Sequence, residues 1–158
     1  MKIENFAIIA APRERVWAGL NDPIVLQQCI TGCEALDSDG EFQFLARLLI
    51  KIGPVKARFS GTVALSDINP PESYTITGEG QGGVAGYAKG QARVNLEALP
   101  DDTTRLSYTV TAEIGGKLAQ LGDRLLQGTA TKLSADFFAQ FSNLMNSSFN
   151  LNNGYDKS

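Results

Sequence analysis

Strict alternation of apolar and polar residues is the most restrictive feature of this sequence. It runs over residues 42–52, 55–65, 74–80, 86–96 and 106–112. A period of two with one apolar side is typical of antiparallel strands that bury one face. On that apolar side, glycine and alanine recur among the large residues. Because small side chains do not fill the space above a bent sheet, the buried face either receives a bulky partner element or leaves a hollow.

Short turn signals separate the alternating stretches. They lie at residues 37–40, 53–54, 69–71, 82–83 and 100–102, and each combines glycine, proline, asparagine or aspartate. Connections this short join neighbouring antiparallel strands, whereas parallel strands need a crossover segment of a dozen residues or more. We therefore predict a meander of hairpins over residues 35–114.

Helical patterns flank the predicted strands. After an opening strand at 2–10, Pro12 begins one short helix, and Asp22 with Pro23 begins a second that runs to Gly32. Apolar residues at helical spacing predict one long helix over 117–149. Within it, Gly122 and Gly128 favour close packing, a kink or ligand space, between which the pattern does not choose.

This order of elements predicts an α+β fold. A strongly bent antiparallel sheet would wrap around the long C-terminal helix, and the two short helices would close one end. We expect residues 1–149 to form a single ligand-binding domain and residues 150–158 to form a polar, frayed tail.

Composition excludes several functional classes. The net charge is −3 and the computed pI is about 4.9, so the chain has no basic footprint for nucleic acid. No apolar run approaches the roughly 20 residues that span a bilayer. Residues 1–6 lack the apolar segment of a signal peptide, which predicts a cytoplasmic protein.

The chain has no histidine, which excludes Ser–His–Asp and Cys–His catalysis and histidine metal ligands. Cys29 and Cys33 lie four residues apart without further thiol or imidazole ligands, so they do not predict a zinc site. We interpret them as small, partly buried thiols in a reducing compartment, and we predict no metal and no cofactor.

Three segments together resemble the family of the carbon monoxide dehydrogenase G subunit. They are the Asn-Asp-Pro junction at 21–23, the Gly-Pro-Val hairpin at 53–55 and the Gly-Gly-Lys-Leu-Ala segment at 115–119. The resemblance spans roughly residues 1–145. One departure is Thr31, where the family usually has proline. Another is the end of this sequence at Ser158, from which we expect no anchoring through the membrane-associating tail that many members carry.

The resemblance implies the helix-grip fold of START-like (SRPBCC) domains. It also implies a role beside molybdenum-containing CO dehydrogenase-type enzymes. The proposed roles of the family are recruitment of the enzyme to the cytoplasmic membrane and handling of a lipophilic molecule such as a quinone. Peripheral association with the inner face of the cytoplasmic membrane follows as an expectation.

The expected register predicts a ligand cavity between the sheet and the long helix. We predict that its lining comprises Phe42, Phe44, Leu48, Phe59, Val63, Tyr74, Ile76, Ala88, Ala92, Tyr108, Val110, Leu118, Leu121, Leu125 and Thr129. The alternative is a solid core in which the small residues admit the helix closely. The tyrosine and threonine hydroxyls are the expected polar contacts, and no inward carboxylate or lysine predicts acid–base catalysis.

Other aromatic and glycine residues suggest a gate and a partner surface. Trp17 on a short helix, with Gly82 and Gly83 at a hairpin tip, would form the gate. Plain core packing of Trp17 and an ordinary tight turn are the alternatives. If the long helix overhangs the sheet, its late apolar residues would form a surface for a partner. That predicted surface comprises Phe138, Met145 and Phe149.

We therefore predict non-catalytic binding of a lipophilic, quinone- or lipid-like molecule, serving a CO dehydrogenase-type enzyme. One alternative is an assembly module that docks a molybdenum hydroxylase and binds no ligand. A further alternative is a polyketide cyclase-like enzyme, for which the sequence supplies no inward acid or base.

Overall fold

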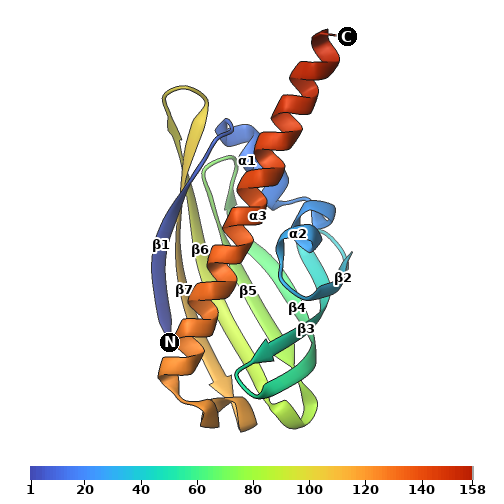
Figure 1. The fold of residues 1–158 in the computed structure, drawn as a ribbon, viewed down its shortest axis with the longest axis vertical. Helices are drawn as coiled ribbons and strands as arrows, with labels where there is room; N and C mark the ends of the chain where they lie inside the picture. Colours follow the sequence, from blue (N-terminus) through green and yellow to red (C-terminus); the bar gives the residue numbers. More distant parts are fainter. Residues whose placement is uncertain (158) are drawn as a thin grey trace.

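A computed structural model describes the backbone of residues 1–157 and the side chains of residues 1–146. The strands form a seven-stranded antiparallel sheet in the order β1-β7-β6-β5-β4-β3-β2 (Figure 1). Their bounds are β1 Lys2–Ile9, β2 Cys33–Ser38, β3 Gln43–Ile52, β4 Val55–Asn69, β5 Ser73–Gln81, β6 Tyr87–Leu99 and β7 Thr103–Gly115. From β2 to β7, each strand pairs with the next along the chain, which confirms the predicted meander. The sheet is not closed, because β1 and β2 form its two edges.

Two short helices follow β1, as the proline and aspartate signals predict. They are α1, Arg13–Leu20, and α2, Pro23–Cys29. The Asp22 side chain caps α2 by accepting a hydrogen bond of 2.9 Å from the backbone N–H of Ile24. Pro23 occupies the first turn, where its missing N–H has no helical partner to lose.

The prediction of one uninterrupted helix from residue 117 was wrong. A 3-10 segment, η2, spans Gly116–Leu121, and the α-helix α3 spans Asp123–Lys157. Gly122 separates them with a φ of 89°, a left-handed conformation that glycine adopts without a steric penalty and that a right-handed helix cannot contain. Helix α3 then crosses the concave face of the sheet (Figure 1).

Two separate clusters of buried apolar residues form the core. The larger cluster joins α1, the middle strands and α3, and it includes Ile9, Val16 and Phe141. The smaller cluster joins β4, η1 (Gly83–Ala85) and η2 through Phe59, Ala85 and Leu118. Packing of α3 therefore fills the concave face in some places and leaves it open in others.

Candidate ligand-binding site

The floor of the site is a set of small residues that lie opposite one another on adjacent strands. Gly61 of β4 pairs with Gly80 of β5, and Gly80 pairs with Ala88 of β6. One row along, Gly78 of β5 pairs with Gly90 of β6. Residues directly opposite in an antiparallel sheet share a face, so the small side chains gather in one area of the concave surface.

A cavity of about 350 Å³ lies above this floor. Helix α3 covers it with Leu126, Thr129 and Leu133, while Phe59 and Leu118 of the smaller core cluster also line it. The lining is almost entirely apolar. A volume of this size lies within the range of roughly 300–1,000 Å³ that small-molecule sites occupy.

The glycines of the floor differ in how much space surrounds them. A Cβ added to Gly61 would collide with the backbone oxygen of Glu79, and one added to Gly90 would lie 2.8 Å from the backbone oxygen of Thr111. At Gly78 and Gly80 an added Cβ would meet nothing nearer than 3.9 Å and 4.0 Å, respectively. The close strand approach therefore requires glycine at 61 and 90, whereas the space above Gly78 and Gly80 is available to a side chain and is left empty.

The structure brings some of the predicted lining residues together at this cavity. Those that line it are Leu48, Phe59, Val63, Ala88, Leu118 and Thr129. They come from β3, β4, β6, η2 and α3, and their common feature is proximity to the glycine-rich floor. The apolar alternation and the pairing of neighbouring strands were sufficient to place the four strand residues, Leu48, Phe59, Val63 and Ala88, on the concave face.

The other predicted lining residues lie elsewhere. Tyr74, Ile76, Tyr108 and Val110 belong to or pack against the larger core cluster, because α1 and the second half of α3 fill that part of the concave face. Phe42 and Phe44 border a separate hollow beside α1 and α2. Three further predicted residues are also absent from the cavity lining: Ala92, Leu121 and Leu125.

Sequence reasoning missed part of the lining. The missed residues include Met1, Ala46, Ile50, Ile52, Gly78, Gly80, Ile114, Leu126, Ala130 and Leu133. Gly78, Gly80 and the β3 residues stood in the alternating stretches and could have been included. Met1 could not, because only the pairing of β1 with β7 brings the start of the chain beside Ala112.

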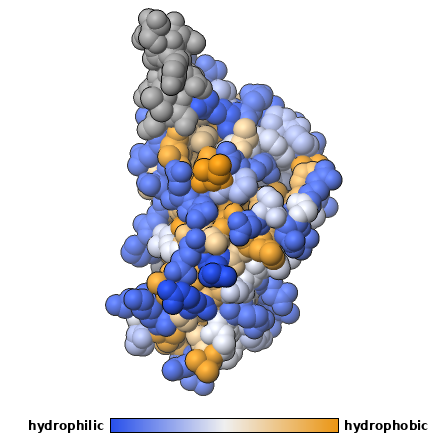
Figure 2. All heavy atoms as spheres, turned by 90° about the vertical axis from the view of Figure 1, so that its right-hand side faces the viewer, coloured by the Kyte–Doolittle hydropathy of each residue, from blue (hydrophilic) through white to orange (hydrophobic). Residues whose placement is uncertain are grey.

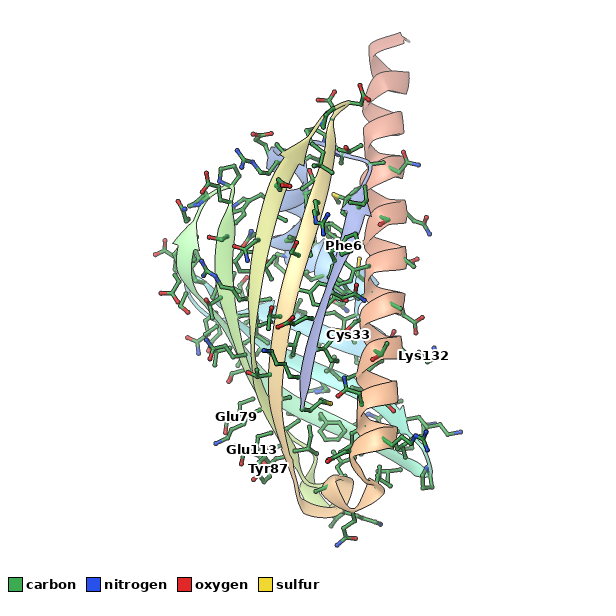
Figure 3. The ribbon with its side chains drawn as sticks, turned by 90° about the vertical axis from the view of Figure 1, so that its left-hand side faces the viewer. Phe6, Cys33, Glu79, Tyr87, Glu113 and Lys132 are labelled. Atoms are coloured by element: carbon green, nitrogen blue, oxygen red, sulfur yellow. The ribbon has the colours of Figure 1, made fainter. Side chains whose placement is uncertain are left out.

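Polar groups are scarce in the cavity. Thr129 lines it, and its hydroxyl makes no hydrogen bond with the described residues. Glu79 and Lys89 contribute to the wall, but both alternate with the inward glycines along their strands, which directs their side chains to the convex face. Figure 3 shows Glu79 on that face. On that face, Lys89 Nζ lies 3.8 Å from Glu113 Oε2. The hydroxyl of Thr129 is thus available to a ligand.

Burial disfavours the charged forms of two tyrosines and two cysteines. Burial raises the pKa of Tyr74, and burial also raises the pKa of Tyr108 although a hydrogen bond with Ser134 partly opposes it. Burial raises the pKa of the Cys29 thiol to about 11, and it raises the pKa of Cys33 as well. Among the described residues, no group of three or more His, Cys, Asp or Glu side chains could hold a metal ion.

The residues predicted to form a gate separate in the structure. Trp17 packs edge-on against Tyr74, with ring centroids 5.2 Å apart, and borders the hollow beside α1 and α2 rather than the cavity. Gly82 lies so close to the ring of Phe59 that a Cβ would collide with it. The tip of the β5–β6 hairpin therefore packs on one wall of the cavity.

The predicted partner surface is not an exposed surface in the described part of the chain. Met145 is 4% exposed and packs beside Gly19 of α1, so the prediction for this residue was wrong. Phe138 is half-buried and stacks on Tyr108. The prediction assumed that the helix overhangs the sheet at these positions, but α1 packs on Met145 and β7 packs on Phe138. Phe149 lies outside the residues whose side chains are described.

An unclosed antiparallel sheet that grips a long C-terminal helix, with short helices early in the chain, defines a START-like, helix-grip protein. A model of the family of the carbon monoxide dehydrogenase G subunit (CoxG) matches residues 7–146. The chain therefore belongs to the CoxG family, as the sequence motifs indicate.

Solved structures agree with this assignment. A conserved protein from Geobacillus kaustophilus is 34% identical with a TM-score of 0.89, covering 94% of this chain and 97% of that chain. A START superfamily protein from Mycobacterium smegmatis is 14% identical with a TM-score of 0.70, covering 92% and 97%. The Zhui aromatase/cyclase from Streptomyces sp. R1128 is 15% identical with a TM-score of 0.66, covering 92% and 93%. The last two likenesses show the fold alone.

A comparison with curated proteins finds no match. Within the described residues, no helix combines the length and apolar character needed to cross a membrane.

Proposed function

We propose that this protein binds a lipophilic small molecule in the cavity without transforming it. The observation that carries the proposal is the space above Gly78 and Gly80, which side chains could occupy and do not. Unfilled apolar space loses packing contacts, at a cost of roughly 24 cal/mol per Å³ where a cavity is fully enclosed, so a partly open apolar cavity of about 350 Å³ is unfavourable without an occupant. A bound apolar molecule restores the lost contacts.

The lining favours a hydrophobic ligand with one polar atom. Removal of apolar surface from water contributes about 25 cal/mol per Å², so burial of roughly 350 Å² of ligand surface would supply about 9 kcal/mol. Ordering costs reduce this figure, and micromolar binding or weaker is the expected range. The Thr129 hydroxyl would donate a hydrogen bond to a carbonyl oxygen, such as that of a quinone, or accept one from a hydroxyl group.

Membership of the CoxG family supports a role for this binding beside a CO dehydrogenase-type enzyme. In that role the protein would carry a quinone- or lipid-like molecule to or from the enzyme at the inner face of the membrane. The same fold in an aromatase/cyclase raises the alternative of catalysis, but the described lining favours binding because its inward side chains offer a hydroxyl and no carboxylate or amine.

Extraction of the purified protein and mass spectrometry of the extract test the proposal. The protein should carry a lipophilic compound or take up added short-chain ubiquinone or menaquinone analogues, and Gly78→Leu with Gly80→Leu should abolish uptake by filling the cavity. Gly128→Leu is the matched control, because nothing lies within 4 Å of a Cβ at this exposed position on α3. Protein that is repeatedly empty and ignores both analogues would overturn the proposal.

A further inference from the structure

A second hollow, of about 360 Å³, lies where β2 and β4 end and β3 begins, beside the α1–α2 junction. It shares no lining residue with the cavity beneath α3. Its lining is also more polar, since it includes Asn21 and Ser38 together with aromatic and proline residues. This hollow therefore differs in chemistry from the lipophilic cavity.

Aromatic side chains form much of its wall. Trp17, Phe42 and Phe44 all border the hollow. Phe42 is 49% exposed and has a φ of 61°, a conformation that non-glycine residues seldom adopt. The backbone oxygen of Phe42 accepts a hydrogen bond of 2.8 Å from the N–H of Leu65, which holds this turn in place. A large aromatic ring is thus kept at the surface of the hollow by the backbone around it.

The chain segments that line the hollow carry acidic residues and no basic ones. All of its lining residues fall within residues 17–44 and 65–70, and neither stretch contains a lysine or arginine. Asp22, Asp39 and Glu41 directly adjoin lining residues in the chain. None of these three carboxylates takes part in an ion pair with the described residues. Because Asp22 already caps the N-terminus of α2, Asp39 and Glu41 are the two acids that favour an occupant with positive charge.

Hydrogen-bond acceptors complete the site. The Asn21 Nδ2 donates a hydrogen bond of 2.8 Å to the backbone oxygen of Trp17, which leaves Asn21 Oδ1 as an acceptor. The Ser38 hydroxyl is exposed and can accept as well. The described lining thus supplies acceptors, π faces and neighbouring negative charge.

We propose that this hollow receives an arginine side chain presented by a partner protein. A guanidinium group is planar, stacks on aromatic faces and donates several N–H groups to nearby oxygen atoms, which matches all three features of the site. A neutral lipid would gain nothing from the neighbouring acidic residues. A lysine ammonium would use the charge but not the planar stacking. The inference is independent of ligand binding in the cavity beneath α3.

Trp17 makes the proposal directly measurable, because it is the only tryptophan of the chain and borders the hollow. The probes are acetyl-arginine amide and a tri-arginine peptide, each compared with its citrulline counterpart, which is nearly isosteric and uncharged. The arginine probes should change Trp17 fluorescence saturably, and the tri-arginine peptide should bind more tightly. Raising the salt concentration should weaken this binding. Citrulline probes should produce little change.

Matched variants separate the hollow from general surface effects. Phe42→Ala should weaken arginine binding roughly threefold to tenfold, whereas Phe6→Ala should not, although Phe6 is 48% exposed and Phe42 is 49% exposed. Asp39→Asn and Glu41→Gln should each weaken binding about two- to fivefold. Glu79→Gln, on the convex face near Glu113, is the charge control (Figure 3).

Three results would overturn the proposal. They are an unchanged Trp17 signal up to millimolar arginine probe, equal binding of arginine and citrulline probes, and equal effects of the site variants and their controls. Failure here is distinguishable from failure of the proposed function, because the Gly78→Leu, Gly80→Leu protein should bind the arginine probes normally if the hollow is the site.

Discussion

The ring of Phe138 on α3 stacks on the ring of Tyr108 on β7, with centroids 4.8 Å apart and 24° between the planes. Phe137 meets Phe138 edge-on at 5.0 Å and stacks on Phe141 at 5.9 Å. This aromatic row fills the concave face where the sheet presents large residues. The cavity begins where the sheet presents glycine and alanine, so the same helix both seals the core and roofs the site.

Replacement of Phe138 by alanine should destabilise the fold. The variant loses the contact with Tyr108 and part of the apolar burial, and we expect the free energy of unfolding to fall by about 2–4 kcal/mol. Urea denaturation measures this change, and Phe138→Leu should lose less. An unchanged denaturation midpoint would show that Phe138 does not anchor α3.

The Thr104 hydroxyl should contribute more to stability than the hydroxyl of the adjacent Thr103. Thr104 is fully buried and donates a hydrogen bond of 2.8 Å to the backbone oxygen of Ala11. Thr104→Val leaves that oxygen without a partner and should cost about 1–3 kcal/mol. Thr103→Val is the control, because Thr103 is more exposed and water can replace its bond to the oxygen of Pro100. Equal losses in thermal unfolding would contradict the explanation.

Two glycine-to-alanine substitutions should change the free energy of unfolding in opposite directions. Gly128→Ala lies in α3 with nothing near its added Cβ, so it should stabilise the protein by about 1 kcal/mol through helix propensity. Gly53→Ala should destabilise by about 1–2 kcal/mol, because Gly53 has a φ of 56° and its Cβ would lie 2.8 Å from Leu125 Cδ2. Changes of the same sign in chemical denaturation would contradict both arguments.

The Cys29 thiol should titrate well above the pKa of an ordinary cysteine. Burial raises its pKa from 9.0 to about 11, because the buried site disfavours the thiolate. The folded pKa exceeds the unfolded one, so the contribution of this thiol to stability is complete below pH 9 and falls as the pH rises towards 11. Thiolate absorbance in a Cys33→Ser variant, with circular dichroism as a check on folding, should give a midpoint near 11. A midpoint near 9 would contradict the burial of this thiol.

Apolar residues on the face with α2 and β2 lie singly or in small groups among polar ones (Figure 2). The most exposed large apolar residue described is Val84, at 95%, on the η1 tip.

Met145, by contrast, is buried by α1. Sequence periodicity placed Met145 beside the main stripe of the helix, but exposure depended on which element packed against it. A helical pattern cannot report the position of a distant element.

Local chemistry determined the strands and the two short helices of this protein. The alternation of 42–52 and 55–65 specified half-buried strands, the short turns specified their antiparallel order, and Asp22 with Pro23 specified the start of α2. Each of these signals acts within a few residues. They were therefore readable from the chain alone.

Only the tertiary structure decided which concave residues surround empty space. Tyr74 and Val63 satisfy the same alternation, yet Tyr74 lies in the core and Val63 lines the cavity. The break at Gly122 sets where α3 begins. The path of α3 across the sheet then sets the distance between the helix and each strand. Whether a small residue closes a contact or leaves a void depends on that distance, which is a property of two segments far apart in sequence.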